Sequence, residues 1–203
     1  MRCAAAAAAL AVLAGCVEIP EVPPREYYVL EDLAGEGTAK PGAAAGRVLL
    51  VNPALASPFY DTQSLVFSRA PGQRAYYQFA AWTERPARAL SELLARRLET
   101  GGSFRAVAAT TAGVRGEVVL HNRLEEFYHN VAENPGSVRI EVTAVLVDAA
   151  ERTLIARRRF VQGAPAASES APAAVAAFNQ ATTALLDEMS VWIEQASAKP
   201  AAH

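Results

Sequence analysis

The stretch from Ser137 to Asp148 restricts the fold more than any other part of the chain, because apolar and polar side chains alternate along it. A period of two places neighbouring residues on opposite faces of an extended strand. One face would carry Val138, Ile140, Val142, Ala144 and Leu146, and the other Arg139, Glu141 and Thr143. The pattern predicts a long strand with one apolar face, and it is the clearest strand signal in the sequence.

Two further segments are predicted to pair with this strand in an antiparallel sheet. Val114–Tyr128 precedes it and is joined to it through Asn134-Pro135-Gly136, which is a turn sequence. Thr153–Gln162 follows it after a short polar turn. We expect Arg157–Arg159 in this last segment to lie at an exposed, solvated edge, where charge discourages aggregation.

Shorter strands are predicted between turn residues in the first half of the chain. The continuous apolar run Val48-Leu49-Leu50-Val51 is typical of a strand buried on both faces, and Pro71-Gly72 marks the turn of a β-hairpin. Glu31–Gly46 is rich in Gly, Ala and Pro, which predicts a flexible loop. The predicted short strands are Tyr27–Leu30, Arg47–Asn52, Ser64–Ser68, Arg74–Phe79 and Phe104–Ala108.

Two segments have the periodicity of amphipathic helices. The first is predicted to begin with Thr83 as its cap and Pro86 in its first turn, and to end at Gly101-Gly102. The second is predicted to begin with Ser170 as its cap and Pro172 in its first turn. Their apolar stripes are Leu90, Leu93, Leu94 and Leu98 in the first, and Val175, Phe178, Leu185, Met189 and Trp192 in the second.

These elements predict an α/β fold, with α+β as the alternative class. The expected architecture is a single domain in which a mixed, largely antiparallel sheet has two main helices packed on it. The domain is predicted to span residues 26–197, followed by a disordered tail over residues 198–203. This length is sufficient for one hydrophobic core.

The N-terminus has the three parts of a secretory signal peptide over residues 1–15. Met1-Arg2 supplies the positive start, Cys3–Leu13 is an apolar run too short to cross a bilayer, and Ala14-Gly15 precedes Cys16. Leu13-Ala14-Gly15-Cys16 also resembles the bacterial lipobox, which implies that the Cys16 sulfur is acylated and holds the protein on a membrane. The alternative is an ordinary cleaved signal peptide that ends near a cysteine.

Residues 16–25 are predicted to form a tether between the lipid anchor and the domain. Pro20, Pro23 and Pro24 favour an extended polyproline II segment, which rises about 3.1 Å per residue. Val17 stands where lipoproteins retained in the inner membrane usually have Asp. By resemblance to lipoproteins in general, the protein is therefore expected on the outer membrane, with its domain facing the periplasm.

Composition argues against a disulfide-stabilised protein and against a nucleic-acid-binding protein. The two cysteines of the precursor are Cys3, which processing would remove, and Cys16, so no disulfide is expected in the mature protein. The precursor has a formal net charge of −2. A nucleic-acid-binding domain would be strongly basic, so no nucleic-acid partner is expected.

The sequence lacks the common catalytic motifs. His121 and His129 fall on the same or a continuing strand and would lie roughly 27 Å apart, too far to share a metal ion, and His203 is terminal. Glu125 and Glu126 are adjacent, so on a regular strand they would point to opposite faces. No nucleophile motif is present. We therefore predict no enzymatic activity, no metal and no cofactor, although an acid–base pair assembled from distant segments stays open.

The order and spacing of several motifs together carry a family resemblance. They are Tyr27-Tyr28-Val29-Leu30, Leu65-Val66-Phe67, Tyr76-Tyr77-Gln78-Phe79, Trp82-Thr83-Glu84-Arg85-Pro86, Arg123-Leu124-Glu125-Glu126-Phe127 and Ala176-Ala177-Phe178-Asn179. With the lipobox and the leucine helix, they resemble the ABC-type transport auxiliary lipoproteins, the PqiC-like proteins that accompany MCE-domain transporters.

This resemblance implies a function in transport. Members are lipoproteins that face the periplasm and are encoded with a permease, an ATPase and an MCE substrate-binding protein. Those systems move phospholipids or other hydrophobic molecules between the inner and outer membranes. The resemblance thus implies an MCE-domain protein as partner, phospholipid as a further ligand, and a homo-oligomeric ring because MCE proteins form rings.

Aromatic residues are the candidate contacts for a partner protein or a lipid. They are Phe59, Tyr60, Tyr76, Tyr77, Phe79 and Trp82, with a second patch at Phe127 and Tyr128 near the tip of the long hairpin. Tyr and Trp are favoured at interfaces because their rings bury a large area while the polar end keeps a hydrogen bond. The alternative is that most of these rings fill the core, with Trp82 at the entry of the first helix.

Two other functions stay open from the sequence. One is a lipid-binding carrier, in which the sheet and helices enclose an apolar pocket. The other is a purely structural envelope lipoprotein with no part in transport.

Overall fold

The computed structural model describes residues 23–35 and 46–198. The predicted signal peptide, Cys16, most of the predicted tether, and residues 36–45 and 199–203 lie outside this range. No helix in the described part of the chain is both long and apolar enough to span a membrane.

The long strand β7 (Val118–Asn130) organises a mixed sheet of nine strands. Along one edge it pairs with the antiparallel strand β8 (Ser137–Asp148). Along the other edge it pairs in turn with three short parallel strands, β2 (Val48–Val51), β3 (Leu55–Ala56) and β4 (Ser64–Ser68). The prediction of a long hairpin formed by β7 and β8 is therefore confirmed.

The remaining strands extend the sheet from these. At one end β6 (Ala106–Ala109) pairs parallel with β2, and at the other β5 (Ala75–Trp82) pairs antiparallel with β4 and parallel with β1 (Glu26–Tyr28). β9 (Leu154–Pro165) adds to β8 in antiparallel register. The longest ladders are antiparallel, as expected. Two short 3-10 turns, η2 (Pro58–Tyr60) and η3 (Thr110–Ala112), interrupt the loops.

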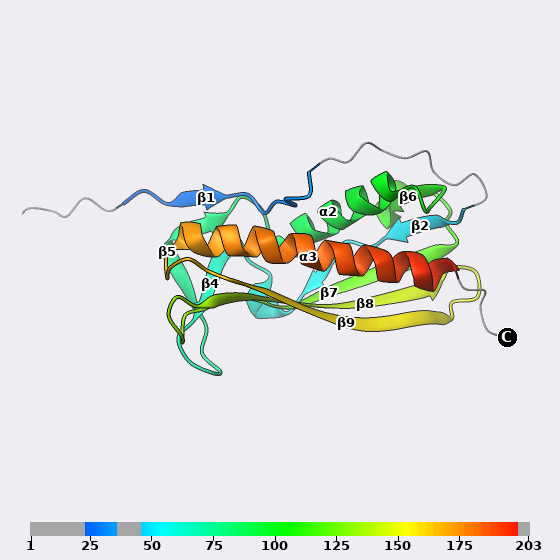
Figure 1. Cartoon of the computed structure of the whole chain (residues 1–203). Coiled ribbons are helices and arrows are strands. Elements are labelled where there is room, and N and C mark those ends of the chain that lie inside the picture. The colour runs from blue at the N-terminus through cyan, green and yellow to red at the C-terminus, as the bar shows by residue number, and fades with distance from the viewer. Residues whose placement is uncertain (1–22, 36–45, 199–203) are drawn as a thin grey trace, which may run out of the picture.

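Two helices, α2 (Pro86–Gly101) and α3 (Ala171–Ala198), lie on one face of this sheet (Figure 1). α3 runs along β8 and β9, while α2 packs on β6, β7 and α3. The architecture is a single mixed α/β domain, which confirms the predicted fold class. Because both helices are on the same face, the other face of the sheet is left without a helix in the described part of the chain.

The core forms where the predicted apolar stripes meet. The predicted apolar face of β8 (Val138, Ile140, Val142, Ala144 and Leu146), the four stripe leucines of α2, and Val175, Phe178, Leu185 and Met189 of α3 are all buried. Trp192 is only half-buried and packs edge-on against Phe160. At the centre Phe178 stacks on Phe127 with ring centroids 4.2 Å apart, and Trp82 packs edge-on against both rings.

One predicted helix cap is confirmed and the other is wrong. The Ser170 hydroxyl accepts a hydrogen bond of 3.3 Å from the Ala173 amide at the start of α3. At α2 the N-cap is Arg85 rather than Thr83. The Thr83 amide instead donates to the Tyr28 carbonyl, because β5 continues to Trp82 beside β1. The glycine stop of α2 is confirmed, since Gly102 is left-handed with φ of 73°.

A β-bulge in β7 overturns the prediction for Glu125 and Glu126. The β7–β8 register shifts between Leu124 and Glu126. Leu124 and Phe127 are both buried, while the two glutamates between them are half-exposed. A bulge inserts one extra residue, so Glu125 and Glu126 both lie on the outer face rather than on opposite faces.

Candidate partner-binding surface

Aromatic side chains gather on the face of the sheet that faces away from the helices. Phe59 of η2 stacks on Tyr76 of β5 with ring centroids 5.0 Å apart and an interplanar angle of 7°. Phe59 is 39% exposed and Tyr76 is 45% exposed. Tyr60 packs edge-on against Phe59 at 5.6 Å but is itself buried. A stacked aromatic pair that is exposed to water is a candidate apolar contact for a partner protein.

Arg74 links these rings to β7. Its Nε donates a hydrogen bond of 2.8 Å to the Tyr60 hydroxyl, and its guanidinium lies 3.7 Å from the centroid of the Tyr128 ring. A terminal guanidinium nitrogen lies 3.3 Å from the Glu126 carboxylate. Burial is the main cause that raises the pKa of Tyr60, so its hydroxyl stays protonated and neutral. Phe59, Tyr60, Arg74, Tyr76 and Tyr128 form what we call the outer aromatic cluster.

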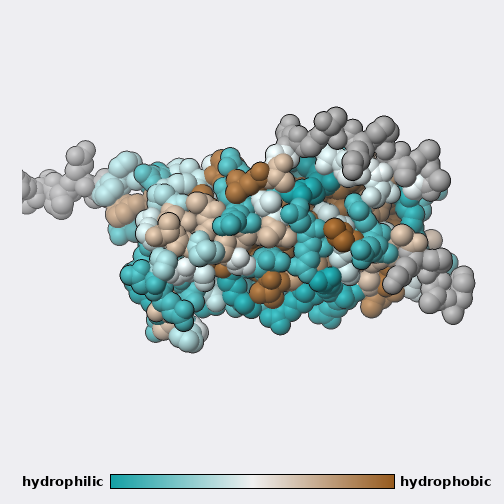
Figure 2. Space-filling view, in the orientation of Figure 1, coloured by the Kyte–Doolittle hydropathy of each residue, from teal (hydrophilic) through white to brown (hydrophobic). Residues whose placement is uncertain are grey.

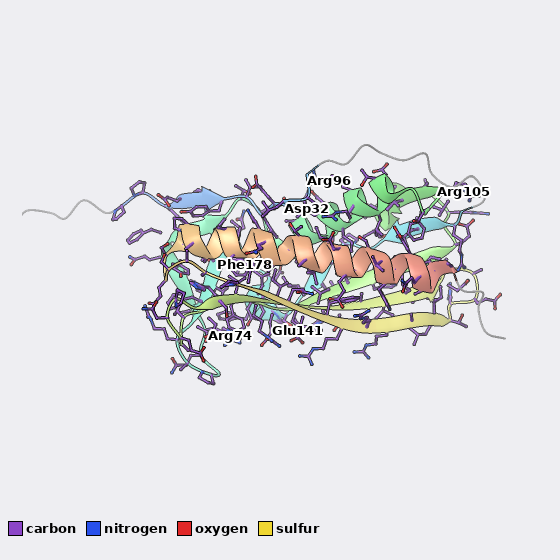
Figure 3. The ribbon with its side chains drawn as sticks, viewed as in Figure 1. Asp32, Arg74, Arg96, Arg105, Glu141 and Phe178 are labelled. Carbon is purple, nitrogen blue, oxygen red and sulfur yellow. The ribbon has the colours of Figure 1, made fainter. Side chains whose placement is uncertain are left out.

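A ladder of ion pairs continues from this cluster across the outer face. Arg139 donates to both Glu126 and Glu141, the latter at 2.9 Å, and Arg159 donates to Glu141 at 2.6 Å. Hydrogen bonds from Arg159 and then Arg139 hold the pKa of Glu141 below its ordinary value. Arg74 and Glu141 lie below the strands in Figure 3, whereas Phe178 lies on α3. Charge-assisted bonds of this kind hold side chains in fixed positions.

The predicted solvated edge at Arg157–Arg159 is only partly correct. β9 pairs only with β8 in the described sheet, and all three arginines are exposed. However, Arg158 pairs with Glu188 of α3, and Arg159 pairs with Glu141. Arg158 therefore reaches the helix side of the sheet, while Arg159 belongs to the outer ladder.

Tyr77 lies on the opposite face of β5 from Tyr76, because successive side chains of a strand alternate. Its hydroxyl forms a hydrogen bond of 2.8 Å with Nδ1 of His129 and lies 3.2 Å from the Glu169 carbonyl oxygen. Burial raises the pKa of Tyr77 to about 12 and lowers the pKa of His129. Both side chains are therefore neutral at pH 7.

Other candidates of the sequence analysis are in the core or beside it. Trp82 and Phe127 are buried against Phe178, and Phe79 is half-buried. Because Trp82 and Phe127 are buried, a partner cannot contact them. Their position agrees with the alternative that most of these rings fill the core. The placement of Phe127 near the hairpin tip was wrong, because β7 continues to Asn130 and its bulge turns Phe127 inward.

Arg74 is the residue of this surface that sequence reasoning missed. The signal was available, since Arg74 and Tyr76 are two residues apart and would share one face of an extended segment. Its contacts with Tyr60 and Tyr128 depend on three separate elements, so no local pattern reveals them.

The helices pack closely on the sheet in the described interior. A gap between α2, α3, β7 and β8 has a volume of about 10 Å³, which is room for one water molecule. No group of three or more His, Cys, Asp or Glu side chains in residues 23–35 and 46–198 is placed to hold a metal ion. His121 is exposed and contacts Asn52, far along β7 from buried His129.

The domain thus combines a helical layer on one face of a mixed sheet with a cluster of aromatic side chains on the other. Residues 28–190 match the family model of the ABC-type transport auxiliary lipoprotein component. The protein belongs to this family, which confirms the resemblance found in the sequence. The family consists of lipoproteins, and its transport-auxiliary character indicates a role other than catalysis.

Solved structures share the fold. The crystal structure of a Xanthomonas campestris protein superposes with a TM-score of 0.71 at 23% identity, covering 84% of this chain and 96% of that one. A hypothetical protein of Chlamydia trachomatis superposes with a TM-score of 0.52 at 12% identity, covering 76% and 99%. Among proteins with curated descriptions, none matches the sequence significantly.

Proposed function

We propose that this protein is an auxiliary lipoprotein of an MCE-type ABC transport system that moves phospholipids or other hydrophobic molecules between the inner and outer membranes. Residues 1–15 are the cleaved signal peptide, and acyl chains on Cys16 hold the domain on the periplasmic face of the outer membrane. The protein is not an enzyme and acts by binding an MCE-domain protein. It does so as a homo-oligomer, since MCE proteins form rings.

The outer aromatic cluster is the observation that supports action by protein contact. Interfaces concentrate their binding energy in a few aromatic and arginine residues, and this surface combines both in a rigid arrangement. Arg74 cannot swing freely, because Tyr60 and Glu126 bind it from two elements. A surface that is already ordered loses little side-chain entropy when a partner binds.

The carrier alternative has less support from the geometry. A carrier needs an enclosed apolar cavity, and the gap between the helices and the sheet is too small for an acyl chain. Mass spectrometry of gently purified protein tests this directly, because retained lipid would favour the carrier. A genomic locus without permease, ATPase and MCE genes would favour a purely structural role.

Capture of the MCE protein from the same locus tests the proposed function. Acylated full-length protein should retain it, and Phe59→Ala combined with Tyr76→Ala should reduce capture about tenfold or more, because hot-spot aromatics dominate such interfaces. Leu154→Ala is the matched control, since Leu154 is an exposed apolar residue on β9. Equal capture by the double variant and the control would remove the cluster from the interface.

The lipid anchor is tested separately. Palmitate should label the wild-type protein and not Cys16→Ser, and Cys16→Ser should be released from the membrane because its acyl chains are lost. A Cys16→Ser protein that stays membrane-bound would contradict the anchor.

A further inference from the structure

A second surface feature lies beside Tyr77 and takes in side chains from both faces of β5. It is a groove of about 310 Å³ that shares Tyr76 with the outer aromatic cluster and is otherwise lined by Phe67, Arg69, Tyr77, Gln78, Val131 and Glu169. We call it the anchor-side groove. Its volume is at the lower end of the range for small-molecule sites. Gln78, Arg69 and Glu169 are exposed, so polar groups surround its mouth.

The groove is at the end of the molecule where the described N-terminus begins. β1 runs parallel to β5 with Glu26 beside Ala80, so residues before Glu26 point toward the Gln78 end of β5. Figure 1 shows β1, β4, β5 and the start of α3 at this same end. If Cys16 is acylated, nine steps along the chain join it to Arg25, or about 28 Å at 3.1 Å per residue. The groove therefore lies close to the membrane on the proposed function.

The walls of the groove are aromatic and held in place. The Phe67 and Tyr77 rings meet edge-on with centroids 5.0 Å apart, and Tyr77 stacks on His129 at 6.4 Å. The hydrogen bond between its hydroxyl and buried His129 fixes the position of the Tyr77 ring. Rigid aromatic faces of this kind attract a cationic group by cation–π interaction.

Opposite charges face the groove from two different elements. Arg69 follows β4, and its guanidinium lies 4.6 Å from the centroid of the Phe67 ring, while Glu169 precedes α3. Both are close enough to Tyr77 for their charges to act on its hydroxyl. Within the described chain neither side chain has an ion-pair partner. A guanidinium and a carboxylate that line the same groove as these rings match a ligand that itself carries both charges.

We propose that the anchor-side groove binds a zwitterionic head group in which a phosphate diester and a primary ammonium are joined by a short carbon chain, as in an ethanolamine phospholipid. Arg69 binds the phosphate through parallel N–H donors, and Glu169 with the Tyr77 ring binds the ammonium. The groove admits the head group alone, and the acyl tails stay in the membrane. This assignment rests on the proposed function, because it names the lipid that the auxiliary protein touches.

Calorimetry on the acylated full-length protein in detergent micelles tests the assignment. Glycerophosphoethanolamine should bind saturably, whereas inorganic phosphate, ethanolamine and glycerophosphoglycerol should each bind about tenfold more weakly or worse, because each lacks one of the two charged contacts. Arg69→Gln and Glu169→Gln should each weaken glycerophosphoethanolamine binding by a similar factor. Arg157→Gln and Glu151→Gln are matched controls at exposed positions and should bind as the wild type does.

Dihexanoyl phosphatidylethanolamine distinguishes the source of the head group. Binding of this lipid at least as tightly as the free head group assigns a membrane lipid, and much weaker binding assigns a soluble phosphodiester. Phosphate binding as tightly as the zwitterion would overturn the proposal, as would unchanged binding in both groove variants, or saturable binding of neither ethanolamine probe. Capture of the MCE protein by Arg69→Gln and Glu169→Gln should persist, so failure here is separable from failure of the proposed function.

Discussion

Glu141 shows how a single carboxylate organises the outer face. It is only 7% exposed and accepts hydrogen bonds from Arg139 and Arg159 on either side. The two arginine side chains are longer than that of Glu141 and more exposed. Their pairing with the buried carboxylate therefore fixes their position on the sheet. The ladder therefore depends on the ionised form of this one residue.

Glu141→Gln should lower the free energy of unfolding at pH 7 by about 1 kcal/mol, because charge-assisted hydrogen bonds become neutral ones. The folded-state pKa of Glu141 lies below its ordinary value, so its contribution is present above the unfolded-state pKa and is lost as the pH falls through the folded-state pKa. The difference between variant and wild type should therefore disappear in acid. Urea denaturation at pH 7 and pH 3 measures it, with exposed Glu151→Gln as the control.

His129 is the residue through which mild acid should act on the fold. It is buried, and burial lowers its pKa, while the charge of Glu169 opposes this shift. The unfolded chain therefore binds a proton more readily, and stability should fall as the pH drops below about 6.5. His129→Gln should show a smaller loss of melting temperature between pH 7.5 and 5.5 than the wild type.

His121→Gln is the matched control for this pH dependence. His121 lies on the same strand but is exposed. The control should retain the wild-type slope. Equal slopes for His129→Gln and the wild type would contradict the assignment of the acid sensitivity to His129.

At the scale of elements, the β7–β8 hairpin depends on the glycine that closes it. Gly136 has φ of +88°, and a Cβ atom there would lie 2.4 Å from the Asn130 carbonyl oxygen and 3.1 Å from Nε2 of His129. Gly72, in the β4–β5 turn, has a similar φ of +75° but open space around it. The two positions thus separate backbone strain from steric conflict.

Gly136→Ala should lower the free energy of unfolding by at least about 2 kcal/mol, because the added methyl group meets backbone atoms that cannot move away. Gly72→Ala should cost about 1 kcal/mol or less, since only the left-handed backbone conformation is penalised. Chemical denaturation of the two variants gives the comparison. Equal losses would show that the contacts around Gly136 relax without cost.

At the scale of the whole molecule, side chains of both helices hold the N-terminal segment against the domain. Arg97 of α2 donates to Asp32 at 2.6 Å and also to Asp187 of α3. The amides of Glu31 and Leu33 donate to Asn179 and Thr183 of α3, at 3.1 and 2.8 Å. In Figure 3, Asp32 lies beside the helices, and in Figure 2 polar side chains cover much of this face. The segment from Glu31 to Leu33 is thereby bonded to both helices.

Arg97→Met should loosen this segment, because Asp32 and Asp187 lose their shared partner. Hydrogen exchange measured by mass spectrometry should become about tenfold faster over residues 29–35, with the β7–β8 hairpin unchanged. Arg96→Met is the matched control, since Arg96 is the neighbouring arginine on α2. Equal exchange in both variants would show that the backbone bonds to α3 suffice.

The sequence by itself determined the main helices and strands and most of the residues that cover the core. The period-two pattern of β8, the leucine stripe of α2 and the stripe of α3 are local, and burial follows from them directly because a strand or helix has only one way to hide its apolar side. The motifs also identified the family. Boundaries moved by a few residues where pairing with a neighbour extended a strand, as Tyr28 does for β5.

Only the tertiary structure decided which aromatic rings face water. Tyr76 and Trp82 are six residues apart on β5, so regular alternation would place them on the same face. However, Tyr76 is exposed and Trp82 is buried. The β4–β5 register shifts between Ser64 and Val66, and beyond that irregularity the side chains of β5 change faces. The bulge in β7 has the same effect at Phe127. Displacing a strand by one residue exchanges its two faces, and long-range pairing sets that displacement. For the same reason, the meeting of Arg74 with Tyr60 and Tyr128 could not be predicted from any one segment.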